Sequence, residues 1–100
     1  MTPEGKVKAL VNKAFKNFPY TWKFMPVQMG MGIPALDYLF CINGRFVAIE
    51  TKVPGKHLTP RQEQTAAAIR AAGGLVYVVY DDDSLICAIA NLAFHCKFAP

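Results

Sequence analysis

Two acidic residues and a lysine are spaced so that a β-hairpin would bring them together. Asn43-Gly44 is the pair most typical of a two-residue hairpin loop, and apolar segments flank it on both sides. When the pairing is counted back from this loop, Asp37 falls directly opposite Glu50. Lys52 lies two residues after Glu50 and therefore projects from the same face of the same strand. The sequence thus predicts two carboxylates and one ammonium group side by side.

Two carboxylates that face each other in a buried sheet repel each other and lose hydration, so the pair predicts a bound cation. Mg²⁺ accepts carboxylate oxygens together with retained waters, and Mn²⁺ can take its place. Beside such a metal, Lys52 would orient a water or stabilise charge on a phosphate oxygen. Two other interpretations remain open. In the first, the residues are ordinary surface charges near a strand end. In the second, the register is shifted by one, which would put Asp37 and Glu50 on opposite faces.

The rest of the chain predicts one compact α/β domain in the order α-β-β-β-α-β-α, a mixed sheet flanked by helices. Thr2 and Thr59 are predicted helix N-caps, each followed by a proline, and Gln62 completes a capping box with Thr59. Asp83 or Ser84 is expected to cap the last helix. Both hairpin arms are apolar on both faces, so they should be central strands of a covered sheet. We expect helices at 2–18, 59–72 and 85–95, strands at 20–28, 36–42, 45–52 and 75–80, and a flexible connection at 29–34.

Charge and cysteine content narrow the class of protein. Eleven lysines and arginines accompany seven acids, and three of these acids are adjacent at 81–83. The remaining basic surface suits a polyanion such as nucleic acid, although ordinary solubility charge explains it equally well. No apolar run is long enough to cross a membrane and no secretory signal is visible, so we expect a cytosolic protein. Three cysteines, expected to be reduced and buried and not spaced with His95 as in a zinc finger, are Cys41, Cys87 and Cys96.

Two helices carry features that point beyond simple packing. The last predicted helix is apolar nearly all round, so one side would pack on the sheet and the other is our candidate homodimer surface. In the first helix, Glu4 lies one turn before Val7 and projects near the apolar face. It is either an acid that stabilises the helix N-terminus or a carboxylate directed into a site.

Three segments together form a recognisable set of motifs. Segment 32–37 ends in an aspartate, segment 44–52 ends in Glu-x-Lys on the following strand, and segment 58–62 places a glutamine in a capped helix. This set resembles the PD-(D/E)xK nuclease superfamily and, more narrowly, the VRR-NUC family. That family has stand-alone phage and bacterial members and a domain in a eukaryotic repair nuclease. The resemblance covers about residues 30–80.

The resemblance implies a role for each motif residue. Asp37 and Glu50 would ligate Mg²⁺ or Mn²⁺, together with the backbone carbonyl of Thr51. Lys52 would position or polarise the attacking water, and Gln62 would support the site from the second helix. The capping box is the alternative explanation of Gln62, and we do not expect one side chain to do both at once.

Glu4 would match an acidic residue that many relatives carry on their first helix near the metal. In one respect the sequence departs from the family pattern. A proline usually precedes the aspartate directly, whereas here Leu36 does and Pro34 comes earlier. Because the proline does no chemistry, the departure bears on how the strand begins and not on activity.

Together these features lead us to expect a metal-dependent DNA endonuclease, selective for four-way junctions or flaps and acting as a homodimer. A less structure-selective nuclease that degrades or nicks duplex DNA is a second hypothesis. A DNA-binding module without catalysis is a third, although a pure binder gains nothing by holding two acids near phosphates. Basic residues expected to contact the DNA backbone are Lys56, His57, Arg61, Lys6 and Lys13.

Overall fold

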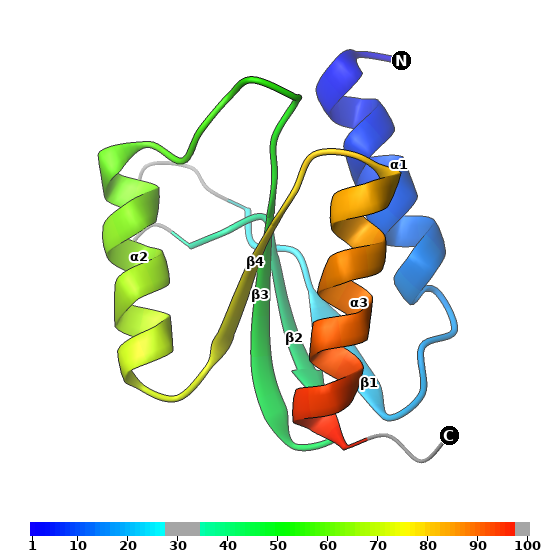
Figure 1. Ribbon diagram of the computed structural model, residues 1–100, viewed down its shortest axis with the longest axis vertical. Coiled ribbons are helices and arrows are strands. Elements are labelled where there is room, and N and C mark those ends of the chain that lie inside the picture. Colours follow the sequence, from blue (N-terminus) through cyan, green and yellow to red (C-terminus); the bar gives the residue numbers. More distant parts are fainter. Residues whose placement is uncertain (28–34, 98–100) are drawn as a thin grey trace.

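The computed structural model describes residues 1–27 and 35–97. Its elements follow the predicted order α-β-β-β-α-β-α, and helices flank both faces of one mixed four-stranded sheet, with α2 on one face and α1 and α3 on the other (Figure 1). The predicted fold class is therefore confirmed. The elements are α1 (Pro3–Phe15), β1 (Thr21–Phe24), β2 (Tyr38–Ile42), β3 (Arg45–Thr51), α2 (Pro60–Ala71), β4 (Leu75–Val79) and α3 (Asp82–Cys96).

The sheet has the strand order β1-β2-β3-β4, so both hairpin strands are central, as predicted. The first three strands are antiparallel, while β3 and β4 run parallel because α2 carries the chain back across the sheet. Asn43 and Gly44 both have positive φ, at 49° and 81°, which a type I′ turn requires. Ile42 consequently pairs with Arg45, and the register counted from the sequence is confirmed along the whole hairpin.

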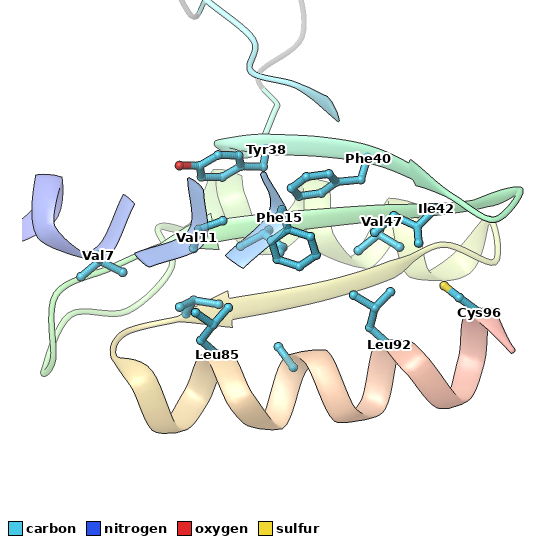
Figure 2. Close-up of a cluster of buried hydrophobic side chains, with 13 residues drawn as sticks. Val7, Val11, Phe15, Tyr38, Phe40, Ile42, Val47, Leu85, Leu92 and Cys96 are labelled. Atoms are coloured by element: carbon cyan, nitrogen blue, oxygen red, sulfur yellow. The ribbon is translucent and has the colours of Figure 1, made fainter. Parts of the chain in front are cut away.

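The larger core lies between the sheet and the layer formed by α1 and α3 (Figure 2). Tyr38, Phe40 and Ile42 project into it at alternate positions of β2, as the period of a strand dictates. A smaller cluster on the opposite face packs α2 against the sheet through Leu36, Ala48, Ala66 and Val76. The side chains that α1 and α3 contribute to the larger core are Val7, Val11, Phe15, Leu85, Ala88, Leu92 and Cys96.

Capping side chains fix where the helices begin. Thr2 caps α1 and Thr59 caps α2, in both cases with a proline inside the first turn, as predicted. The cap of α3 is Asp81, so the prediction of Asp83 or Ser84 was wrong. Ser84 instead occupies the third helical position and completes a capping box, because its hydroxyl accepts from the backbone N–H of Asp81.

Two N-terminal elements are shorter than expected, and a proline follows each. Helix α1 ends at Phe15 instead of residue 18. Pro19 disfavours helical backbone angles at the residue before it, so the helix cannot continue to residue 18. Strand β1 ends at Phe24, two residues before Pro26, which has no N–H to give to a strand ladder. The predicted end of this strand at residue 28 and the predicted connection at 29–34 lie outside the described residues.

The sheet is less fully covered than the apolar sequence implied. Trp22 pairs with Cys41, which pairs with Phe46, and all three side chains are exposed on the face that α2 covers only in part. Cys87 is also exposed, on the outer side of α3, so only Cys96 is buried as predicted. All three thiols are free. None of the helices in the described ranges is long and apolar enough to cross a bilayer.

Candidate active site

Asp37 sits at a bend immediately before β2. In a regular strand the side chains of Leu36 and Tyr38 would lie on the same face of the sheet. Here Leu36 packs toward α2 whereas Tyr38 packs toward α1 and α3, so the chain turns over at Asp37. Oδ2 of Asp37 accepts hydrogen bonds from the N–H of Thr51 at 3.0 Å and from its hydroxyl at 2.7 Å. Its other oxygen, Oδ1, lies 3.8 Å from Nζ of Lys8. The carboxylate of Asp37 is therefore partnered from β3 and from α1.

Glu50 lies opposite Asp37 in the hairpin, as predicted, but its side chain is partnered differently. Its Oε1 accepts from the backbone N–H of Asp37 at 2.9 Å, and its Oε2 accepts from Nε2 of Gln62 on α2, also at 2.9 Å. Only 3% of Glu50 is exposed to solvent. The predicted juxtaposition of the two acids holds. Asp37 is paired with Lys8 of α1 and Glu50 with Gln62 of α2, on opposite faces of the sheet, yet the negative charge of Asp37 still acts on Glu50.

Gln62 performs two tasks at once, so the expectation that one side chain would not do both was wrong. Its Oε1 accepts from the N–H of Thr59 to complete the capping box, while its Nε2 donates to Glu50. An amide carries an acceptor and a donor on different atoms, and this division makes both contacts compatible. The N-terminus of α2 is thereby held against β3 at the level of Glu50.

Burial raises the pKa of Glu50 above its ordinary 4.5, and the negative charge of Asp37 adds to the effect. The N–H of Asp37 and the ammonium of Lys52 oppose the rise without cancelling it. An acid whose pKa is raised on folding contributes stability that is fully present below its unfolded pKa. That contribution is lost as the pH rises through the folded pKa. Ionisation of Glu50 therefore costs the metal-free fold stability.

This sign yields a pH prediction for the metal-free protein. We compare the free energies of unfolding of the wild type and Glu50→Gln in urea, with a chelator present, at several pH values. As the pH falls from neutrality toward 4.5, the difference should shift in favour of the wild type, because only its side chain can take up a proton. A difference that stays constant across this range would contradict the raised pKa.

Lys52 follows β3 directly and brings a positive charge to the acids. Its Nζ lies 3.6 Å from Oε2 of Glu50, and its backbone N–H donates to the carbonyl of Val79 on β4. In a trans peptide group the N–H and the preceding carbonyl point in opposite directions. The carbonyl of Thr51 is therefore directed away from β4, toward the side on which Asp37 lies. The Thr51 carbonyl and the Asp37 carboxylate therefore lie on the same side of β3, and Glu50 precedes Thr51 in that strand.

The donor set suits a hard divalent cation. Asp37 and Glu50 supply carboxylate oxygens and Thr51 a carbonyl oxygen, the ligand types that Mg²⁺ and Mn²⁺ prefer, and such ions fill their other positions with water. A cation would also offset the cost of keeping Glu50 ionised while buried. Among the described residues, no group of three or more His, Cys, Asp or Glu side chains lies close enough to hold a metal. The fit is thus to a site with two carboxylates.

An open cleft of about 350 Å³ lies beside Lys52 at the end of the sheet where β3 ends. The N-terminal turns of α1 and α2 border this end, as the upper part of Figure 1 shows. Glu4, Lys56 and His57 line the cleft together with Lys52, so the structure brings these four predicted residues together. The other lining residues are Val53 and Thr59.

Three other predicted DNA-contact residues are exposed but do not line this cleft: Arg61, Lys6 and Lys13. Lys13, in the last turn of α1, lies about 14 Å along the helix from Glu4. Lys8, which the sequence reasoning missed, is the lysine of α1 that contacts the acids. Its spacing of four from Glu4 was the available signal, because residues four apart share a helix face.

Tyr38 is a further residue that the sequence reasoning did not single out. Its hydroxyl lies 3.2 Å from the carbonyl of Lys8 and 3.1 Å from Oδ1 of Asn12, and it donates to these acceptors on α1. Burial, reinforced by the negative charge of Asp37, raises the pKa of Tyr38 to about 12. The phenol therefore keeps its proton at neutral pH and fixes α1 beside the site.

The comparisons with known proteins bear on the fold. No protein-family model matches the sequence, and no curated protein matches it either. A solved structure described as a VRR_NUC domain is similar in three dimensions, with a TM-score of 0.76 and 22% sequence identity. The similarity covers 90% of this chain and 97% of the other. The chain therefore has the fold of a VRR_NUC domain, as the resemblance of its motifs predicted.

Proposed function

We propose that this protein is a DNA endonuclease that depends on Mg²⁺ or Mn²⁺. The observation that carries the proposal is the arrangement of Asp37 and Glu50. The backbone N–H of Asp37 holds Glu50, and the N–H of Thr51 holds Asp37, so each acid is fixed by a backbone N–H from the other arm of the hairpin. Lys52, 3.6 Å from Glu50, adds a positive charge at the edge of an open cleft. The similarity to a VRR_NUC domain supports a nuclease.

The proposed reaction is hydrolysis of a phosphodiester. A water oxygen bonds to phosphorus as the P–O3′ bond breaks, which leaves a 5′-phosphate and a 3′-hydroxyl. A metal bound by Asp37, Glu50 and the Thr51 carbonyl would lower the pKa of that water and stabilise negative charge on the phosphate. Lys52 directs its ammonium toward the same charge, and Gln62 keeps Glu50 in position through its Nε2. In this proposal Glu4 remains a candidate third acid at the edge of the cleft.

Lys56 and His57 are exposed and line the cleft next to Lys52. We therefore propose that they contact phosphates of the DNA backbone that enters the site. Contacts to phosphates position a duplex without reading its sequence. Arg61 and Lys6, both exposed near the N-terminal turns of their helices, would extend this contact surface. Lys13 lies at the other end of α1 and would require a longer stretch of DNA.

Selectivity for branched DNA is tested by comparing cleavage rates on a labelled four-way junction, on a flap and on the duplexes that make up their arms. If the protein is structure-selective, the junction or flap is cleaved about ten-fold faster or more, a difference worth about 1.4 kcal/mol in the barrier. Equal rates would favour the second candidate, a nuclease that cuts or nicks duplex DNA. DNA binding without any cleavage would favour the third, a binding module.

We assign the homodimer to α3, whose outer side carries exposed apolar residues. Ile86 is 64% exposed and Phe94 is 78% exposed, and both lie on the side away from the buried stripe of the helix. Phe94→Lys should convert a dimer to a monomer in light scattering at micromolar concentration, because a charge buried in an apolar interface is strongly unfavourable. Trp22→Lys, an equally drastic change at another exposed aromatic residue, is the control and should leave the dimer intact. A monomeric wild type would contradict this assignment.

A further inference from the structure

Lys8 lies between two acids at the edge of the proposed metal site. Its Nζ is 3.7 Å from Oε1 of Glu4 and 3.8 Å from Oδ1 of Asp37. Neither separation is short enough for a hydrogen bond, so both contacts are ion pairs without fixed geometry. About a third of the Lys8 side chain is exposed, which weakens each pair further through solvent screening. Lys8 is thus a neighbouring cation that is easily moved.

The hydrogen-bond partners of the two acids are held much more firmly. Oδ2 of Asp37 accepts two hydrogen bonds from Thr51, and the two oxygens of Glu50 accept from the N–H of Asp37 and from Gln62. These bonds are 2.7–3.0 Å long and involve buried or partly buried groups. A divalent cation that approaches Asp37 therefore meets the least resistance at Oδ1, the oxygen that faces Lys8.

The backbone at Lys8 is fixed even though its side chain is not. The carbonyl of Lys8 accepts from the hydroxyl of Tyr38 at 3.2 Å, and that hydroxyl also contacts Asn12 one turn later. The ammonium can therefore leave Asp37 without any shift of α1. Glu4, on the same helix face, offers it a second carboxylate.

We propose that Lys8 is a displaceable counter-ion of Asp37, which neutralises this carboxylate in the metal-free protein and moves to Glu4 when a divalent cation binds. The proposal rests on the proposed function in one respect, that Asp37 is a metal ligand. It makes Lys8 a positioning residue that sets the affinity for metal. It also assigns Glu4 an indirect role, through Lys8, in place of direct ligation.

The test is Mn²⁺ binding to the full-length protein without DNA, measured by calorimetry, for wild type and Lys8→Met. Removal of a positive charge about 4 Å from a ligand oxygen should tighten Mn²⁺ binding by about ten-fold. Lys6→Met removes an equal charge from an exposed position on the same helix and should change the affinity by less than about two-fold, since solvent and salt screen it. Circular dichroism of each variant verifies that α1 is intact.

A double-mutant cycle distinguishes an indirect role of Glu4, through Lys8, from direct ligation of the metal. In the wild-type background Glu4→Gln should weaken Mn²⁺ binding, because Lys8 then has no second partner and stays on Asp37. In the Lys8→Met background the same change should weaken binding by less than about two-fold, because solvent screens the exposed Glu4 carboxylate. If Glu4→Gln weakens Mn²⁺ binding there by about ten-fold or more, Glu4 is itself a ligand and the proposed transfer of Lys8 to Glu4 is overturned.

The outcomes distinguish this inference from the proposed function. If the wild type binds Mn²⁺ and Asp37→Asn does not, the metal site stands. An unchanged or lower affinity in Lys8→Met would then overturn the role of Lys8 alone. If the wild type binds no Mn²⁺, both the metal site and the role of Lys8 are overturned.

Discussion

Lys52→Ala is expected to lower the rate of metal-dependent DNA cleavage by about 100- to 1000-fold, the usual loss when one preorganised charge is removed from a developing oxyanion. The Lys52 ammonium lies 3.6 Å from Glu50 and beside the cleft, and among the described residues no other lysine pairs with that acid. Lys52 belongs to neither hydrophobic core cluster, so the fold should persist, although the loss of its ammonium removes a charge that stabilises the ionised form of Glu50. Single-turnover cleavage of labelled DNA measures the effect.

Lys23→Ala is the matched control for that experiment. Lys23 is an exposed lysine on β1, at the edge of the sheet away from β3, and its replacement should leave the rate unchanged. Mn²⁺ binding by Lys52→Ala should persist, which separates loss of chemistry from loss of the metal. Equal cleavage by Lys52→Ala and the wild type would remove Lys52 from the active site.

Asp37→Asn is expected to abolish both metal binding and cleavage while the protein stays folded. The asparagine side chain retains an oxygen for the two hydrogen bonds from Thr51, so the strand contact survives, but the charge that attracts the cation is lost. At a Mn²⁺ concentration 100 times its dissociation constant, the wild type should gain about 2.7 kcal/mol of stability and the variant almost none. Thermal unfolding with and without Mn²⁺ measures this difference.

The control for the metal experiment is Asp83→Asn. Asp83 is an exposed acid in the first turn of α3 and is not part of the hairpin, so its loss should leave the Mn²⁺-induced stabilisation intact. If Asp37→Asn is stabilised by Mn²⁺ as much as the wild type is, Asp37 is not a ligand. The proposed site would then have to be abandoned.

The hairpin was predictable because local chemistry fixes it. Asn43 and Gly44 adopt the positive φ values of a two-residue turn, and such a turn leaves only one register for the strands that follow. Asp37 and Glu50 could therefore be placed opposite each other by counting alone. The capping box of Thr59 and Gln62 was predictable for the same reason, since it depends on residues three apart.

Features that depend on tertiary contacts were not predictable in this way. The bend at Asp37 arises because Leu36 packs toward α2 while Tyr38 packs toward α1 and α3, and no short motif encodes that division. Contact between Lys8 and Asp37 depends on how α1 packs on the sheet, which the sequence does not state. The exposure of Cys41 likewise follows from the partial coverage of one sheet face by α2.

The most direct test of the central claim is cleavage of 5′-labelled junction, flap and duplex DNA by the wild-type protein, with Mn²⁺ and with a chelator in parallel. The proposed site predicts products that appear only with the metal and whose new ends carry a 5′-phosphate. It also predicts that these products are lost in Lys52→Ala. Absence of metal-dependent products on all three DNAs would contradict a nuclease built on Asp37, Glu50 and Lys52.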